Sequence, residues 1–66
     1  MWKKFRDLKI GDVVELADGG TAKVLSCPGP TMARSCLGVE IRMNGDDGPL
    51  SWCAQRPDAD VFVRNT

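Results

Sequence analysis

Residues 10 to 27 read IGDVVELADGGTAKVLSC, a stretch that decides the fold because it encodes two short strands joined by a tight turn. In the first predicted strand, residues 12–17, Val14 and Leu16 point to one face of a sheet and their neighbours point to the other. The second predicted strand, residues 21–27, continues the same type of pattern. The stretch therefore predicts a half-buried β-hairpin.

The turn of this hairpin is the strongest local signal in the chain. Asp18-Gly19-Gly20 supplies residues that accept positive φ angles, as a tight hairpin turn requires. If the pairing register follows this turn, Ala22 and Val24 face inward with the apolar residues of the first strand.

Three more strands are predicted further along, at residues 37–43, 50–54 and 61–64. The clearest is the first, because its apolar residues alternate with other residues: Leu37, Val39, Ile41 and Met43. Residues 44–49 are dense in turn formers and predict a second hairpin. Within residues 55–60, Arg56-Pro57-Asp58 predicts a short 3₁₀ turn before the last strand.

The two remaining segments have no clear periodicity. We expect residues 1–9 to be a lead-in segment or a short helical turn that lays Trp2, Phe5 or Leu8 over one end of the core. Proline at positions 28 and 30 ends the second strand, because proline lacks the amide donor that a ladder needs. A loop over residues 28–35 should follow.

Length and composition limit the range of functions. With 66 residues the chain forms a single domain, residues 1–66, near the lower limit of independent stability, so assembly with further copies is an open alternative. Nine basic and nine acidic residues cancel, which removes the global field typical of nucleic-acid or membrane binding. The chain has no histidine, the commonest general base, which weighs against catalysis. Lacking a long apolar run or a secretory signal, it is expected in the cytoplasm and away from membranes.

Cys27, Cys36 and Cys53 are interpreted as reduced thiols, since three cysteines cannot all pair within one chain. Zinc binding with a carboxylate as fourth ligand is the alternative, but the close Cys-x-x-Cys pair of structural zinc sites is missing. We therefore expect no metal site and no cofactor. Whether adjacent strands bring two thiols within disulfide range is open at this stage.

The order of predicted elements matches an SH3-like barrel, and so do particular residues. The pattern Ile10-Gly11-Asp12-x-Val14-x-Leu16-x-x-Gly19-Gly20 resembles the opening of small bacterial and phage SH3-like proteins, including KOW-type modules and the YodC-like family. Residues 38–42 and Trp52 fit the third and fourth strands of such barrels. The resemblance implies an all-β, five-stranded SH3-like barrel, and through its KOW-type relatives it implies RNA or protein binding.

The N-terminal segment is the first candidate site, for nucleic acid. Cations interleaved with aromatic residues contact phosphates and stack on bases, and this chemistry selects Trp2, Lys3, Lys4 and Arg6, with Arg34 as a further cation. The alternative is an ordinary solvated terminus whose aromatic residues cap the barrel, and the zero net charge favours it.

The second candidate site is for a protein partner. Met32 and Arg34 in the 28–35 loop combine a flexible apolar side chain with a forked cation, although the same loop also fits a plain connector. Trp52 is a core residue if it points inward and a binding platform if it points outward. An exposed edge strand or apolar face would also permit self-association.

Other patterns carry less chemistry. Asp46-Asp47 sits among turn formers without the spacing of a calcium loop, and Gly19-Gly20 lacks the features of a phosphate loop. SH3-like dihydrofolate reductases of the plasmid-borne type suggest a small-molecule site at an oligomer interface, but their Val-Gln-Ile-Tyr signature is replaced here by residues 49–53, PLSWC. The sequence thus predicts a non-enzymatic binding or adaptor module for a protein partner or for itself, with nucleic acid and an oligomeric small-molecule site as alternatives.

Overall fold

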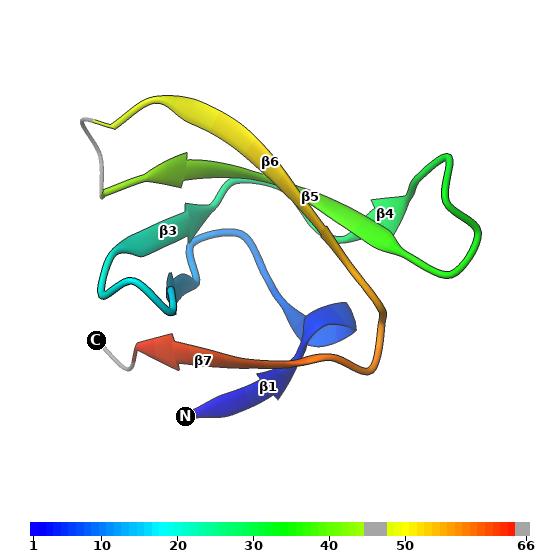
Figure 1. Cartoon of the computed structure of the whole chain (residues 1–66), viewed down its shortest axis with the longest axis horizontal. Coiled ribbons are helices and arrows are strands. Elements are labelled where there is room, and N and C mark those ends of the chain that lie inside the picture. The colour runs from blue at the N-terminus through cyan, green and yellow to red at the C-terminus, as the bar shows by residue number, and fades with distance from the viewer. Residues whose placement is uncertain (45–47, 65–66) are drawn as a thin grey trace.

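The computed structural model describes residues 1–44 and 48–64, which form seven strands and one short 3₁₀ helix (Figure 1). In chain order these elements are β1 (Trp2–Lys4), η1 (Phe5–Asp7), β2 (Val13–Glu15), β3 (Thr21–Val24), β4 (Gly29–Pro30), β5 (Leu37–Met43), β6 (Leu50–Gln55) and β7 (Asp60–Arg64). Asp46 and Asp47, predicted to lie in a turn, are outside the described residues. The all-β prediction is confirmed.

All strand pairs are antiparallel, in the order β1-β7-β2-β3-β5-β4, with β6 on the other edge of β5. The central strand is β5, which pairs with β3 and β4 along one edge and with β6 along the other. Within the described ranges β6 pairs with β5 alone, so the sheet does not close on itself. In Figure 1, β6 forms one margin of the molecule and β1 the opposite margin.

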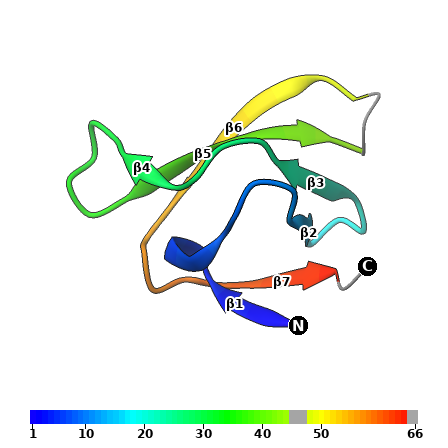
Figure 2. The ribbon, with the colours of Figure 1, turned by 180° about the vertical axis from the view of Figure 1, so that it is seen from behind.

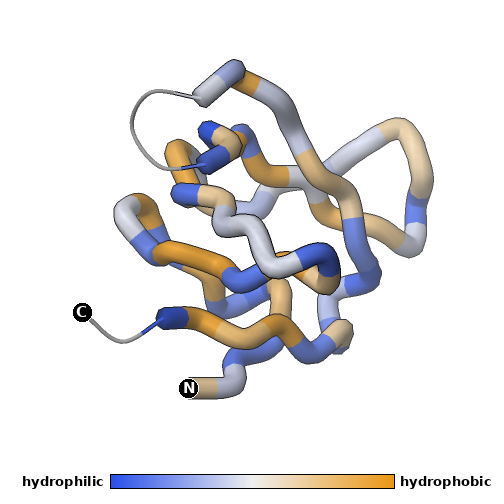
Figure 3. Tube along the Cα trace, turned by 60° about the vertical axis from the view of Figure 1, so that its left-hand side comes forward, coloured by the Kyte–Doolittle hydropathy of each residue, from blue (hydrophilic) through white to orange (hydrophobic). Residues whose placement is uncertain are grey.

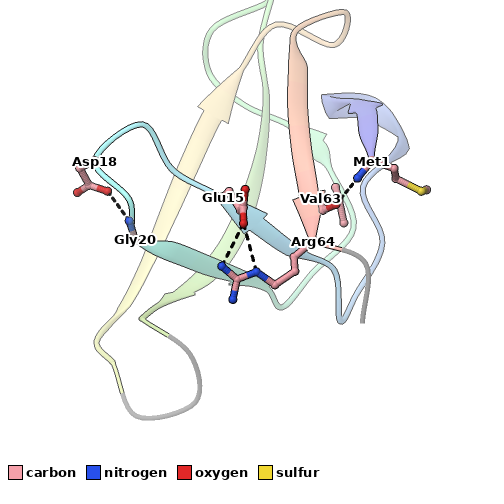
Figure 4. A network of polar contacts seen from close by, with 6 residues as sticks. All are labelled: Met1, Glu15, Asp18, Gly20, Val63 and Arg64. Carbon is pink, nitrogen blue, oxygen red and sulfur yellow. Dashed lines mark hydrogen bonds and ion pairs between the residues drawn. The ribbon is translucent and has the colours of Figure 1, made fainter.

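The predicted hairpin is present, with strands shorter than expected. Val14 lies opposite Ala22 and Glu15 opposite Thr21, so the register follows the turn as predicted. The turn is closed by the Leu16 amide on the Gly20 carbonyl (2.8 Å), and the Gly20 amide donates to Asp18 Oδ1 (2.9 Å; Figure 4). Gly19 has φ of +90°, which explains the need for glycine there.

The core lies on the inner face of the curved sheet. Its buried residues come from nearly every segment: Phe5, Leu8, Ala22, Val24, Val39, Ile41 and Val63. Val14, Leu16, Leu37 and Met43 pack against them, which confirms the predicted inward faces of the hairpin and of β5. Hydrophobic stretches are interspersed with hydrophilic ones along the trace, as Figure 3 shows.

The N-terminal segment is an integral part of this fold. Figure 2 shows how the chain leaves β1, makes η1 and rises to β2. Trp2, Phe5 and Leu8 were the residues predicted to cover one end of the core. Phe5 and Leu8 are buried there, whereas Trp2 is 69% exposed. Met1 and Val63 exchange hydrogen bonds of 2.7 Å in both directions, which extends the pairing of β1 with β7 (Figure 4).

The 3₁₀ helix lies in the N-terminal segment, where a short helical turn was one of the predicted alternatives, and not before the last strand, where a 3₁₀ turn was predicted. The 3₁₀ helix lies at residues 5–7, where the Leu8 amide donates to the Phe5 carbonyl (3.2 Å). Before the last strand, residues 56–59 form a single turn closed by the Ala59 amide on the Arg56 carbonyl (3.1 Å). Pro57 suits the second position of this turn, and β7 begins directly after it at Asp60.

Candidate functional site

The N-terminal cations predicted to bind nucleic acid are largely neutralised by carboxylates. Lys3 Nζ lies 3.0 Å from Asp12 Oδ2, and the Lys3 side chain is only 17% exposed. Lys4 Nζ lies 2.7 Å from Asp60 Oδ1 across the β1–β7 pair. Phosphate groups would therefore have to compete with carboxylates already in place.

Asp12 connects this segment to the start of β2. Its Oδ2 accepts hydrogen bonds from Lys3 Nζ and from the Lys9 amide, each 3.0 Å long. Partial burial raises the pKa of Asp12, but these two hydrogen bonds and the positive charges of both lysines outweigh burial and hold the pKa below its ordinary value of 3.8. The arrangement is that of a structural ion pair.

Four of the five residues in the predicted nucleic-acid set line one surface hollow, which contains Trp2, Lys3, Lys4 and Arg6. The Trp2 ring packs edge-on against Phe62, its partner in the β1–β7 register, with ring centroids 5.3 Å apart. Arg6 is exposed in this hollow. Arg34 lies in the loop between β4 and β5 and does not line that hollow.

Two of the three residues predicted to contact a protein partner also lie together. Met32 is fully exposed and Trp52 is 67% exposed, and both line one surface hollow of about 460 Å³. Trp52 thus points outward. A Cβ atom on Gly38 would lie 3.7 Å from the Trp52 ring and 2.9 Å from Thr31 Cγ2, so glycine leaves room for both side chains.

The outer face of β6 continues this apolar surface beyond the predicted residues. In the β5–β6 register, Leu50, Trp52 and Ala54 lie opposite Arg42, Glu40 and Gly38. Successive side chains of a strand alternate between faces, so these three side chains share the outer face. Leu50 is 65% exposed. Sequence reasoning missed Leu50 and Ala54, although their alternation with Ser51 and Cys53 was a usable signal.

The free edge of β6 presents the backbone groups of the same three residues. The Met43 amide donates to the Pro49 carbonyl (3.0 Å), which fixes position 49 as facing β5. Antiparallel pairing alternates along a strand, so positions 51, 53 and 55 also face β5. The N–H and C=O groups of Leu50, Trp52 and Ala54 therefore point away from β5, toward the side where the described part of the chain places no strand.

A cleft of about 650 Å³ lies on the inner side of the sheet, where mostly apolar residues such as Val14, Leu16 and Val61 line it. Two carboxylates at its rim are engaged in ion pairs, Glu15 with Arg64 (3.0 Å; Figure 4) and Asp60 with Lys4. Within residues 1–44 and 48–64 no cluster of metal-ligating side chains occurs, and the three cysteines are free thiols.

Comparisons with known proteins identify no relative for this chain. No family model, no curated protein and no solved structure matches it. No helix in the described ranges is long and apolar enough to cross a membrane.

Proposed function

We propose that the protein is a non-catalytic binding module on an SH3-like scaffold, and that it takes up an extended polypeptide segment along β6. One observation carries this proposal: outward-pointing backbone groups at Leu50, Trp52 and Ala54 coincide with exposed apolar side chains. Backbone pairing at a sheet edge provides affinity, and pockets beside the edge provide specificity. The order β7-β2-β3-β5-β6 supports the SH3-like assignment.

The contrast between the strand edges supports this choice of site. Natural proteins protect exposed edges with lysine, proline or very short strands. Two lysines protect β1, and β4 has two residues of which one is Pro30. In contrast, β6 is six residues long and contains neither charge nor proline. An unprotected edge of this kind is expected where another strand is meant to pair.

The hollow on the outer face, which lies over β5 between β4 and Trp52 of β6, indicates the chemistry of the partner. Met32, Pro30 and the Trp52 ring provide apolar contacts, and Glu40 is an exposed acidic group near them. A segment with apolar side chains at alternate positions would place them on the same face as Trp52 while its backbone pairs with β6.

The alternatives have less support. Nucleic-acid binding through the N-terminal segment would use Lys3, Lys4 and Arg6, of which Lys3 and Lys4 already pair with Asp12 and Asp60. A small-molecule site would have to use the inner cleft, whose apolar lining continues into the buried core. Neither alternative explains the uncharged edge of β6.

The proposal is tested by selecting peptides from a displayed random library for binding to the protein, which is immobilised at low density. The informative pair of variants is Ala54→Pro, which removes an outward N–H without touching the β5 ladder, and Ala54→Ser, which retains it. Enriched peptides should bind the wild type and Ala54→Ser alike and lose about tenfold in affinity for Ala54→Pro, as expected for a lost hydrogen bond. If no enriched peptide distinguishes the two variants, the β6 edge is not the binding site. Circular dichroism verifies that both variants are folded.

A further inference from the structure

We infer that the segment that pairs with β6 is β6 of a second copy of this chain, antiparallel to the first and related to it by a twofold axis at Trp52. This inference rests on the proposed function of the β6 edge and identifies its partner. It predicts a symmetric dimer whose two sheets join into one.

The alternation of backbone groups selects the register. Outward N–H and C=O groups belong to positions 50, 52 and 54. With the axis at Trp52, position 50 meets 54, 52 meets 52 and 54 meets 50, and each such pair exchanges two hydrogen bonds, about six in all. If the axis lies at Ser51 or Cys53 instead, only two of positions 50, 52 and 54 on each strand find a hydrogen-bonding partner within the other β6. The central register therefore satisfies the most backbone groups.

Side chains on the outer face also fit this register. Trp52 lies opposite Trp52 of the second copy, and aromatic pairs of this kind stabilise adjacent strands. Leu50 lies opposite Ala54 of the second copy, beside which β5 has Gly38. A large side chain thus meets a small one over a glycine at both ends of the interface.

Charge does not oppose the pairing. Each β6 strand is uncharged, and the formal net charge of the chain is zero. The nearest like charges by register are the two Glu40 side chains, one beside each Trp52. They are separated by three strand spacings of about 4.8 Å, roughly 14 Å, which exceeds the Debye length of about 8 Å at physiological salt.

The interface is short, so the dimer should be weak. Six residues a side fall below the 20 to 30 residues a side of a standard interface, in the range of transient contacts. We expect a reversible equilibrium with a dissociation constant of about 10 to 1000 μM.

Sedimentation equilibrium across this concentration range tests the dimer. The wild-type mass should rise from 7.2 kDa toward twice that value as concentration increases. Ala54→Ser should behave in the same way, whereas Ala54→Pro should remain monomeric. A second pair of variants tests the dimer independently of position 54. Trp52→Lys should abolish the dimer. Trp2 is about equally exposed but lies on the opposite margin, so Trp2→Lys should retain the dimer.

Disulfide trapping tests the register. Positions 51 and 53 of opposite copies form a non-hydrogen-bonded pair with Cα atoms about 4.5 Å apart, within disulfide range. In protein with Cys27→Ser and Cys36→Ser, adding Ser51→Cys should make linked dimers form at least about tenfold faster in oxidised glutathione. Equally fast linkage through Cys53 alone would place the axis at Cys53 and overturn the register.

Failure of the dimer and failure of the proposed function give different results. A wild type that stays monomeric up to about 1 mM, or a dimer that forms equally in Ala54→Pro, overturns the inference. If displayed peptides nevertheless bind Ala54→Ser more tightly than Ala54→Pro, the proposed function is supported although the dimer is not. If neither peptide binding nor dimerisation differs between Ala54→Pro and Ala54→Ser, the proposed function and the proposed dimer are both wrong.

Discussion

Phe5 provides a quantitative test of the role of the N-terminal segment. Its ring is 2% exposed and belongs to η1, the element that covers one end of the core. Replacing a buried phenylalanine with alanine costs about 3 to 5 kcal/mol, from lost burial and from the cavity left behind. For 66 residues the total free energy of unfolding is about 3 to 10 kcal/mol. Phe5→Ala should therefore remove a third or more of the stability, and in the lower part of that range it unfolds the protein.

Urea unfolding followed by far-ultraviolet circular dichroism, at a concentration where the chain is monomeric, measures this effect. Phe5→Leu retains an apolar side chain and should cost less, about 1 to 2 kcal/mol, so it yields a value even if Phe5→Ala is unfolded. Trp2→Ala is the matched control: the ring is mostly exposed, and its edge-on contact with Phe62 contributes about 0.5 to 1.5 kcal/mol.

The ranking of the three variants decides the outcome. Phe5→Ala should be the most destabilising by a clear margin. If it costs no more than Trp2→Ala, Phe5 does not belong to the core, and residues 1–9 would be a dispensable lead-in segment.

Three further predictions concern other parts of the molecule. Because the folded-state pKa of Asp12 lies below 3.8, its stabilisation is present above that pH and is lost as the pH falls through the lower folded value. Asp12→Asn should thus lower the free energy of unfolding by about 1 kcal/mol at pH 7, and its difference from wild type should shrink below about pH 4. Asp7→Asn, at an exposed position, is the control and should change the free energy of unfolding little at either pH. A difference for Asp12→Asn that does not depend on pH would contradict the ion pair. In thermal unfolding, Gly19→Ala should lower the free energy of unfolding by about 1 to 2 kcal/mol, because the φ angle of Gly19 is +90°. Gly29→Ala is the control: open space surrounds the added methyl group, so this change should be neutral or slightly stabilising. Finally, labelled RNA or duplex DNA at low salt should show no saturable binding, since Lys3 and Lys4 are already paired; a salt-sensitive complex that Arg6→Ala weakens would restore the nucleic-acid hypothesis.

The strands with strong periodicity could be predicted from sequence, and the shortest ones could not. β5 was predicted with its observed ends because four apolar residues alternate along it. β1 and β4 have three and two residues, too few for any period, and they are strands only because β7 and β5 supply partners. Tertiary pairing of this kind leaves no local trace in the sequence.

The candidate site shows the same division. Met32 and Trp52 were identified as partner-binding residues from their chemistry, and the fold places them in one hollow. The neutralisation of Lys4 could not be predicted, because Asp60 is 56 positions away in the chain. Nor could the free edge of β6 be predicted, since it depends on which side of β5 each neighbouring strand occupies.

The position of β7 between β1 and β2 has a consequence for how the protein is made. During translation β1 and β2 leave the ribosome early, yet the strand that each pairs with on this side is synthesised after all the others. Until residues 60–64 emerge, the N-terminal strand has no ladder to join and Val14 lacks its partner Val63. The nascent chain therefore cannot complete its sheet piece by piece, and assembly of the two ends is a late step that follows release of nearly the whole domain.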